Sequence, residues 1–446
     1  MRETLPFTLI EEMTHHLERR FQPLDMQGEI ASSARVDIDE LRSATGTAMQ
    51  LHPMSRARRR PSRPTDTRYW WEIPSDPGPV PVYEVDSEEY DLRTVRNRLY
   101  GHQFDLTEEP PFAMVVYRGG GIDGGDRILQ STSHVVADGV GVLRFSHATW
   151  TAYRGEEPVG DTVGLHESRS LLENLRPTTP RDACEAAETV GRRLRDGVLS
   201  PTDIADDGGS DRPGWGYERR VLDADLTGRL IATRPPGVSV NDVLLTALHL
   251  AIEAWNDAHG EPTGWLGVMM PVNVRPDDWF YQVMAMYTLF ERVRTNRAHR
   301  RNPGTALARV ARQTTRIKER DLPERAYEAL ALLPDGLPVA LERHLPDLLR
   351  DGGARLLDTA VLTNLGNVPV SPSLGEGTES EVWFSPPTWR QIPIGIAVGT
   401  FDGELHLFCR YLLEQFDEPA AARFVDTYVT HIERLVDEVL PAVTAD

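Results

Sequence analysis

The residues of this 446-residue chain most suggestive of chemistry are His134 and Asp138, which form the pattern His-x-x-x-Asp-Gly with Gly139. Among the 13 histidines, His134 alone has an aspartate four residues later. An imidazole titrates near neutral pH, so a positioned histidine can take a proton from an alcohol or an amine and return it later. The pattern therefore predicts general acid–base chemistry at His134, with Asp138 anchoring the turn and Gly139 supplying backbone freedom where a helix begins.

Two other interpretations fit the same residues. A buried histidine beside an aspartate that caps a helix would give the same spacing. A metal site could also use His134 and Asp138, but zinc or iron needs a third and a fourth protein ligand. The chain has no His-x-x-x-His or Cys-x-x-Cys pair to supply them, so the sequence predicts no metal site.

The elements around the motif must hold these side chains in place. Residues 128–133 alternate in polarity as a strand does, and residues 140–153 have a helical pattern. Residues 112–117 alternate as well, and a glycine-rich connection joins the two runs as in a hairpin. A strand is therefore expected to deliver His134 to a turn that a helix follows.

The rest of the chain divides at a segment rich in Gly, Pro, Asp and Glu, within which only residues 180–196 have a helical pattern. We therefore expect an N-terminal lobe at 1–175, a linker or crossover at 176–216 and a C-terminal lobe at 217–446. In the last of these, Ser239 is typical of a helix N-cap before an apolar helical pattern. The predicted helices of this lobe cover 224–234, 240–259, 303–333, 338–350 and 419–439, and its predicted strands cover 217–222, 264–271, 360–365, 381–384, 394–401 and 404–411.

Composition limits the classes of function. The hydrophobic fraction of 40% and the charged fraction of 26% are those of a globular protein. A net charge of −20 argues against nucleic-acid or anionic-membrane partners, which need a basic surface. No run of about 18 apolar residues predicts a membrane span, and the N-terminus lacks the pattern of a signal peptide. Two cysteines are too few for a disulfide framework, which favours a cytoplasmic protein.

Several segments together resemble the chloramphenicol-acetyltransferase-like superfamily. Ser133–Gly139, Ser-His-Val-Val-Ala-Asp-Gly, is similar to its active-site motif, with Ser133 where many relatives carry a first histidine and His134 at the catalytic position. Other similar segments follow in the family's order at 51–58, 104–106, 110–112, 240–245, 270–276 and 363–369. The superfamily includes nonribosomal-peptide condensation enzymes, wax ester synthase/diacylglycerol acyltransferases and polyketide-associated acyltransferases. The chain most resembles free-standing condensation-type acyltransferases.

The resemblance implies an α/β fold of two chloramphenicol-acetyltransferase-like lobes, each a mixed sheet flanked by helices, with an active-site tunnel between them. An acyl thioester of coenzyme A, or of the phosphopantetheine arm of an acyl or peptidyl carrier protein, would enter from one side. A small-molecule alcohol or amine would enter from the other, and His134 would deprotonate it to give an ester or an amide, as in natural-product biosynthesis. No cofactor stays bound, and Gly139 leaves room for the pantetheine arm.

Further residues receive roles from their places in these segments. Asp138 is expected to form a structural ion pair with Arg275 or with Arg56, between which the sequence does not choose. Asn364 either donates a hydrogen bond near the reacting carbonyl or holds a turn at a strand end. Basic side chains that could meet a phosphate or an acidic carrier protein, or could be solvated surface charges, are Arg58, Arg59, Arg60, Arg300 and Arg301.

Three classes of function follow. The favoured one is an acyltransferase that uses His134 as a general base without an acyl-enzyme, because the chain has neither a Gly-x-Ser-x-Gly elbow nor a cysteine nucleophile motif. The second is a catalytically idle relative that binds a carrier protein or a thioester, in which His134 would be turned away or blocked. The third is a metal-dependent hydrolase that uses His134 and Asp138, which a metal assay would test.

Overall fold

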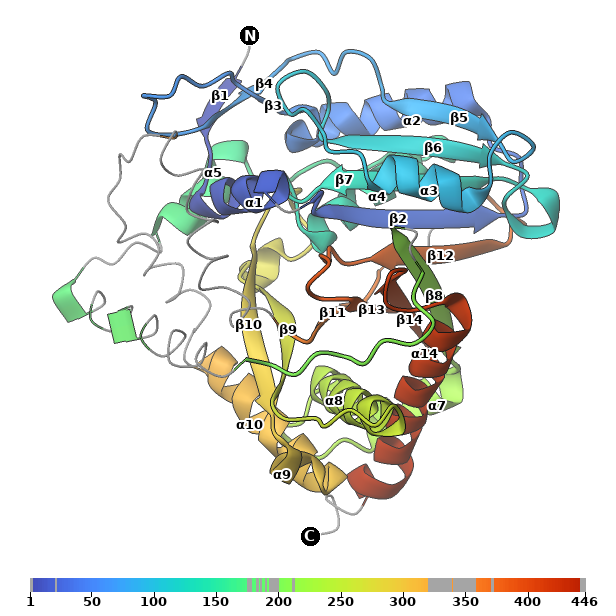
Figure 1. The fold of residues 1–446 in the computed structure, drawn as a ribbon. Coiled ribbons are helices and arrows are strands. Elements are labelled where there is room, and N and C mark those ends of the chain that lie inside the picture. The colour runs from blue at the N-terminus through green and yellow to red at the C-terminus, as the bar shows by residue number, and fades with distance from the viewer. Residues whose placement is uncertain are drawn as a thin grey trace.

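Two mixed β-sheets organise the chain, one in each of two lobes, with helices packed against both (Figure 1). This computed structural model describes residues 3–20, 22–174, 179–181, 184, 187–188, 191, 200–210, 213–319, 339, 358–369 and 373–441. Within these residues, no helix is long and apolar enough to cross a membrane. The expected α/β architecture of two lobes is confirmed.

The first lobe is built on a five-stranded sheet in the order β12-β2-β7-β6-β5. Only β5 and β6 pair in parallel, and the other neighbours are antiparallel. The central strand β7 is hydrogen-bonded on both sides, which fixes the backbone that leads to the motif. The strands are β2 (Asp25–Ser32), β5 (Val82–Asp86), β6 (Phe112–Arg118), β7 (Arg127–Ser133) and β12 (Ser380–Ser385).

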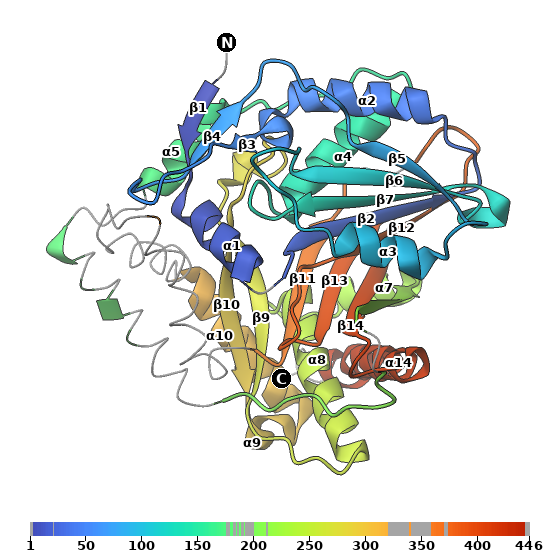
Figure 2. The ribbon, with the colours of Figure 1, turned by 45° about the horizontal axis from the view of Figure 1, so that its top comes forward.

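Helices cover both faces of this sheet (Figure 2). On one face, Ser146 of α4 (Gly139–Tyr153) donates to Gln130 of β7. On the other, Arg96 of α3 (Leu92–Tyr100) pairs with Glu29 of β2. Helix α2 (Ile38–Leu51) packs beside α4. A small third sheet has the strand order β1-β4-β3 and consists of β1 (Glu3–Pro6), β4 (Trp70–Ile73) and β3 (Arg58–Arg59). Helices α1 (Leu9–Arg20) and α5 (Leu165–Asn174) lie toward this small sheet.

The second lobe is built on a six-stranded sheet in the order β10-β9-β11-β13-β14-β8. Strand β11 runs parallel to both of its neighbours, and the other pairs are antiparallel. The strands are β8 (Trp215–Leu222), β9 (Leu266–Asn273), β10 (Thr288–Thr295), β11 (Ala360–Asn367), β13 (Ile394–Phe401) and β14 (Glu404–Leu412). The helices are α7 (Ala224–Ala232), α8 (Val240–Ala258), α9 (Arg297–Arg300), α10 (Pro303–Glu319) and α14 (Glu418–Arg434).

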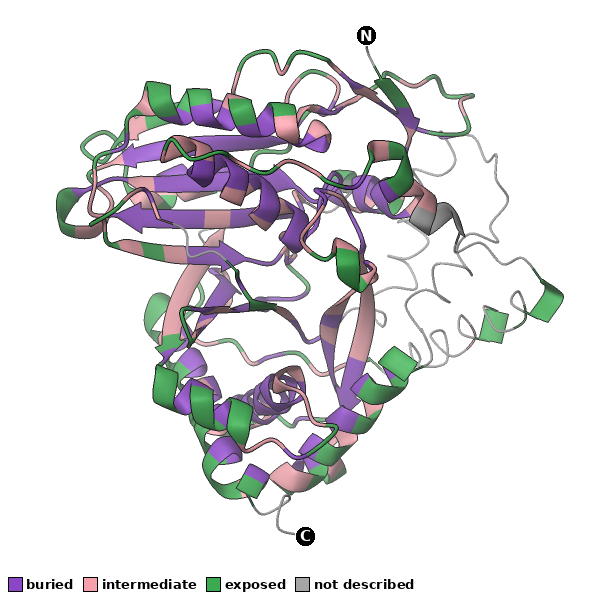
Figure 3. Cartoon of the chain, turned by 180° about the vertical axis from the view of Figure 1, so that it is seen from behind, coloured by how far each residue is buried: buried purple, intermediate pink, exposed green. Residues whose placement is uncertain are grey.

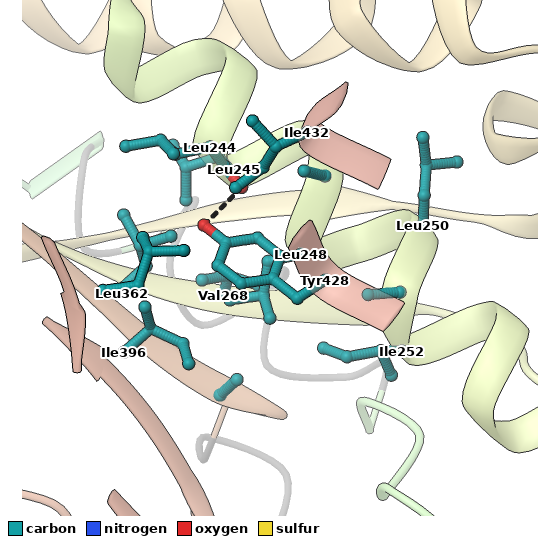
Figure 4. Close-up of a cluster of buried hydrophobic side chains, with 14 of the residues drawn as sticks. Leu244, Leu245, Leu248, Leu250, Ile252, Val268, Leu362, Ile396, Tyr428 and Ile432 are labelled. Atoms are coloured by element: carbon teal, nitrogen blue, oxygen red, sulfur yellow. Dashed lines mark hydrogen bonds between the residues drawn. The ribbon is translucent and has the colours of Figure 1, made fainter. Parts of the chain in front are cut away.

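The core of the second lobe forms around α8, which is apolar on most of its surface and therefore buried. It packs against α10 and α14, and Leu244, Leu248 and Ile252 lie in the same apolar cluster as Val268 of the sheet (Figure 4). The one polar group in this view is satisfied, because the Tyr428 hydroxyl donates to the Leu244 carbonyl at 3.2 Å. In both lobes, the strands are mostly buried and the helices are exposed on their outer faces (Figure 3).

Strand β12 joins the two lobes. It comes from the C-terminal half of the chain, yet it pairs with β2 at the edge of the first sheet, from Ser380 beside Ser32 to Ser385 beside Gln27. Residues 380–385 therefore belong structurally to the first lobe, although the sequence-based division grouped them with 217–446. The pairing covers the edge of β2, which would otherwise expose unpaired backbone groups.

The local expectations around the motif are confirmed: the strand at 128–133 is β7 and the helix at 140–153 is α4. Ser239 caps α8 and forms a capping box with Asp242. Strand β10, which carries charged residues on an otherwise apolar pattern, was not predicted. Most of the expected helix at 180–196, nearly all of the one at 338–350 and the part of 303–333 beyond 319 lie outside the described residues.

Candidate active site

His134 lies at the C-terminal end of β7, in the turn that leads to α4. Because β7 pairs with β2 and β6, the strand that carries the histidine is fixed on both sides. The N–H of Val136 donates to the Ser133 carbonyl at 3.3 Å and tightens the turn. His134 is 4% exposed, so its imidazole is almost enclosed by protein.

One hydrogen bond decides which nitrogen of His134 carries the proton. Its Nδ1 lies 2.8 Å from the carbonyl oxygen of Ala137. A carbonyl can only accept, so Nδ1 donates and Nε2 of the neutral ring keeps its lone pair. Burial lowers the pKa of His134 below its ordinary value of 6.5, and the Ala137 carbonyl and Asp138 offset only part of this shift. The ring is thus neutral at pH 7, as a general base must be.

Asp138 forms a buried, two-pronged ion pair with Arg275. Two guanidinium nitrogens donate to its two carboxylate oxygens at 2.6 and 2.8 Å, and the two side chains are 1% and 0% exposed. Burial alone would raise the pKa of Asp138, but Arg275 and backbone N–H donors outweigh it and hold the pKa below 3.8. The carboxylate is therefore charged wherever the protein is folded near neutral pH.

Three further donors complete the surroundings of the Asp138 carboxylate. The N–H of Gly141 donates at 3.0 Å as in a helix N-cap, the N–H of Tyr287 at 2.9 Å and the Thr288 hydroxyl at 3.1 Å. With those of Arg275, five donors meet a group that has about four lone-pair positions. Asp138 is thus fully used in anchoring the turn, which leaves it no lone pair for a metal ion.

This anchor connects the two lobes. Asp138 precedes α4 of the first lobe, whereas Arg275 follows β9, and Tyr287 and Thr288 lead into β10 of the second. The Ala285 carbonyl strengthens the connection by accepting from the Asp138 N–H at 3.2 Å and from Arg275 at 2.8 Å. The ion pair therefore holds the histidine turn against the second lobe.

Sequence reasoning missed the contributions of Ala285, Tyr287 and Thr288. Ala285 and Tyr287 act through backbone atoms, which carry no residue-type signal, and only the Thr288 hydroxyl could have suggested a polar role. Gly141 was missed as well: a Cβ on it would lie 3.1 Å from both the N and the O atom of Ala285. The close approach of α4 to the second lobe therefore needs a glycine at this position.

The other arginine considered as a partner of Asp138 lies elsewhere. Arg56, in a short 3₁₀ turn after α2, donates to the backbone carbonyls of Pro74 at 2.7 Å, Gln50 at 3.1 Å and Met49. It thus joins the end of α2 to the residues after β4 and makes no contact with the motif.

The proposed basic patch is only partly at the surface. Arg58 and Arg59 are half-buried in β3, and Arg60 and Arg301 are exposed. The expectation that Arg300 lies in a surface patch is wrong. Arg300 is 3% exposed, pairs with Glu253 at 3.1 Å and donates to the Thr295 hydroxyl at 3.0 Å. A guanidinium committed to the interior cannot meet a phosphate or a carrier protein at the surface.

Asn364 lies near the end of β11, where its side-chain oxygen accepts from the N–H of Gly366 at 2.8 Å. Gly366 has a φ of 70°, which favours glycine, and the pairing of β11 with β13 shifts register here. Of the two roles expected for Asn364, the contacts support the structural one, which fixes the turn at the strand end. The next residue, Leu365, lies 3.1 Å from where a Cβ on Gly139 would be.

Ser133 lies on the opposite face of β7 from Gln130 and contacts a buried acid. Its hydroxyl donates to Glu18 of α1 at 3.2 Å, and Ser131 donates to Asp25 at 2.8 Å. Burial raises the pKa of Asp25 to about 7 and that of Glu18 well above its ordinary value. At the position that the sequence resemblance compares with a first histidine, a hydroxyl thus donates to a buried carboxyl group.

The structure offers no ready metal centre in the residues it describes. No three His, Cys, Asp or Glu side chains in that part of the chain are grouped so that they could hold an ion.

Sequence comparison finds two relatives of this chain, and comparison with solved structures finds proteins that share its fold. No family model matches the chain. An uncharacterized protein of Mycobacterium tuberculosis strain H37Rv, Rv2305, is 31% identical over 437 residues, covering 96% of this chain and 99% of the relative. The uncharacterized protein MT2362 of strain CDC 1551 matches with the same values.

Solved structures share the fold at low sequence identity. The first condensation domain of the CDA synthetase matches with a TM-score of 0.72 at 13% identity, covering 98% of this chain and 97% of the other. The epimerization domain from the third module of tyrocidine synthetase B matches with a TM-score of 0.68 at 17% identity, covering 99% and 98%. The X-domain from teicoplanin biosynthesis matches with a TM-score of 0.62 at 16% identity, covering 98% and 96%. The chain therefore belongs to the same family as the two mycobacterial proteins, and it has the two-lobed fold of condensation and epimerization domains.

Proposed function

We propose that this protein is an acyltransferase that moves an acyl group from a thioester to a hydroxyl or an amine. The donor is an acyl-coenzyme A or an acyl group on the pantetheine arm of a carrier protein, and the reaction belongs to natural-product biosynthesis. The observation that carries the proposal is the state of His134: a neutral ring, oriented by the Ala137 carbonyl, with the lone pair of Nε2 available. The fold shared with condensation domains supports it.

In the proposed reaction, Nε2 of His134 takes the proton of the acceptor while the acceptor oxygen or nitrogen attacks the thioester carbonyl carbon. The tetrahedral intermediate then collapses, the carbon–sulfur bond breaks, and the leaving thiolate takes the proton from the imidazolium. The Ala137 carbonyl and the nearby Asp138 charge both favour the imidazolium that forms between these steps. Asp138 and Arg275 position the turn and do not touch the reacting atoms.

A covalent acyl-enzyme on cysteine has little support. Cys409 lies in β14 with its side chain buried, and burial raises the pKa of its thiol far above the range in which a thiolate forms. Cys184 is exposed. Direct attack of the acceptor therefore remains the simpler route, and two unpaired cysteines agree with a proposed site of action in the cytosol.

The proposal is tested by incubating the purified protein with a panel of acyl-coenzyme A and acyl-carrier-protein thioesters, each with candidate alcohols and amines. We expect a new ester or amide by mass spectrometry and an equal amount of released thiol. Thiol release without an acylated acceptor would indicate a hydrolase. Binding of a thioester with no turnover across the panel would favour a catalytically idle, thioester-binding protein.

The pH dependence of kcat/KM should report the lowered pKa of His134. A base whose pKa lies below 6.5 is more than half unprotonated at pH 6.5, so kcat/KM should keep at least half of its maximal value as the pH falls from 8 to 6.5. Below the pKa, protonation of Nε2 removes the lone pair and kcat/KM should fall about tenfold per pH unit. The profile of kcat/KM is measured from pH 5 to 8.5, with the thioester below its KM and the acceptor at a saturating concentration. An acid limb centred above pH 6.5 would contradict the role of His134 as this base.

A further inference from the structure

An apolar cleft opens beside the histidine turn, between the first sheet and α4. It is open on one side, and its lining is almost wholly apolar. Strands β2, β7 and β12 form its floor, and α4 lies behind these strands in Figure 2. The apolar side chains that line it include Met26, Ile30, Val142, Leu143, Trp150 and Leu365.

One end of the cleft is the motif itself. Gly139, which directly follows Asp138, lines the cleft, and a Cβ placed on it would lie 3.1 Å from Leu365 and 3.2 Å from Met26. Met26 pairs with Thr132, two residues before His134 on β7. Alternation along β7 places Gln130, Thr132 and the histidine in one row, and Gln130 also lines the cleft. The cleft therefore begins beside the turn that carries His134.

The other end lies deeper in the first lobe. Three apolar side chains line this end: Ile30 and Ile128, which pair in the sheet, and Trp150 of α4. Met26 and Ile30 are four strand residues apart, which is about 13 Å. Carbon–carbon bonds of about 1.5 Å advance a zigzag chain by roughly 1.3 Å each, so about ten carbons span this distance.

The polar side chains that line the cleft from α4 and β7, Ser146 and Gln130, are already hydrogen-bonded. The Ser146 hydroxyl donates to Gln130 at 2.9 Å, and the Gln130 amide donates to the Thr132 hydroxyl at 3.1 Å. The carboxylate of Glu29 binds Arg96 and Arg127 on the opposite face of the sheet, so only its backbone lies near the cleft. An occupant thus meets hydrocarbon, with no charged partner, as an alkyl chain requires.

Gly28, in the middle of the cleft floor, has no side chain and so leaves space in the cleft. Gly28 pairs with Gln130 and lies between Met26 and Ile30 on the cleft side of β2. A Cβ on it would meet only the Trp383 carbonyl oxygen, at 3.8 Å, and its φ is not positive. A larger side chain is therefore compatible with the backbone and would project into the cleft.

We propose that this cleft binds the alkyl chain of the acyl donor and selects a straight chain of about ten carbons. The inference rests on the proposed acyl transfer and specifies its donor. The thioester carbonyl lies at the Gly139 end beside His134, and the methyl terminus lies near Ile30, Ile128 and Trp150. Each methylene that enters the cleft leaves water, so kcat/KM should rise about fourfold per methylene until the cleft is full.

The test compares Gly28→Leu with Gly228→Leu. Gly228 lies exposed on α7 with nothing within 4 Å of a new Cβ, so it receives the same chemical change without touching the cleft. Wild-type protein and Gly228→Leu should prefer decanoyl- over butanoyl-coenzyme A, and Gly28→Leu should lower this ratio of kcat/KM values about tenfold or more. Val142→Phe, which fills the cleft from α4, should lower it in the same direction and replaces Gly28→Leu if that variant does not fold.

A binding measurement that needs no catalysis separates this inference from the proposed function. Decanoic acid should raise the melting temperature of the wild type and of Gly228→Leu, and should do so far less for Gly28→Leu or Val142→Phe. If decanoic acid binds in this pattern but no thioester is turned over, the cleft binds acyl chains and the proposed acyl transfer is wrong. If thioesters are turned over with no preference for chain length and decanoic acid stabilises no variant selectively, the inference about the cleft is overturned.

Discussion

The substitution His134→Ala should lower kcat of acyl transfer about 10²–10⁴-fold, the usual contribution of a well-placed general base. The loss follows from the removal of Nε2, whose lone pair is free because Nδ1 donates to the Ala137 carbonyl. The fold should survive, because β7 and its neighbours are held by backbone pairing and the turn is anchored by Asp138. Activity is measured with the best thioester and acceptor found in the substrate panel, and folding by circular dichroism and melting temperature.

The variant His134→Asn separates a catalytic from a structural role. Its side-chain amide can still donate to the Ala137 carbonyl, as Nδ1 does now, but it has no basic nitrogen at the place of Nε2. We expect the melting temperature to recover toward that of the wild type while kcat remains as low as in His134→Ala. His166, exposed on α5, provides the matched control, and His166→Ala should keep full activity. Substantial turnover by His134→Asn would refute the base assignment.

The substitution Arg275→Met should have the largest effect on stability. It leaves the Asp138 carboxylate 1% exposed without its cationic partner, and breaking one half of a buried pair typically costs about 3–5 kcal/mol. Guanidinium denaturation at pH 7 measures the loss. The exposed Arg229 pairs with Asp225 and Asp437 on the surface, and Arg229→Ala should leave the denaturation midpoint close to that of the wild type.

The same variant should change how stability depends on pH. In the wild type the folded-state pKa of Asp138 is lowered, so its contribution is present above pH 3.8 and is lost as the pH falls through the folded value. Without Arg275, burial dominates and raises this pKa, so the variant should become relatively more stable as the pH falls toward 5. Adding Asp138→Asn should restore stability at pH 7, because the double variant buries no unpaired charge. A double variant as unstable as the sum of the two single ones would argue against the pair.

Local features around the motif could be predicted because they depend on residues close together in the chain. Alternating polarity at 128–133 and the helical pattern at 140–153 gave β7 and α4, and the Asp138 side chain caps α4 at its own first turn. The capping box of Ser239 and Asp242 is similarly local. In each case the hydrogen-bonding partner lies within about four residues, so sequence spacing is enough to specify it.

Distant pairings could not be predicted in this way. Arg56 and Arg275 both occupied motif-like positions, and only the packing of the second lobe brings Arg275, 137 residues away, onto Asp138. From the sequence, Arg300 was expected at the surface, but in the structure it is buried and pairs with Glu253 of α8. The burial of a charged side chain depends on partners that the fold supplies, so residue type alone misplaces it.

Short-range patterns in the amino-acid sequence were enough to predict that a strand, a turn and a helix present His134. Three features became clear only from the three-dimensional packing: the neutral imidazole with its proton on Nδ1, the use of Asp138 as an anchor between lobes, and the pairing of β12 with the first sheet. Secondary structure follows from short-range periodicity and capping, whereas protonation, ion pairing and strand exchange depend on burial and on atoms that lie far apart in the chain.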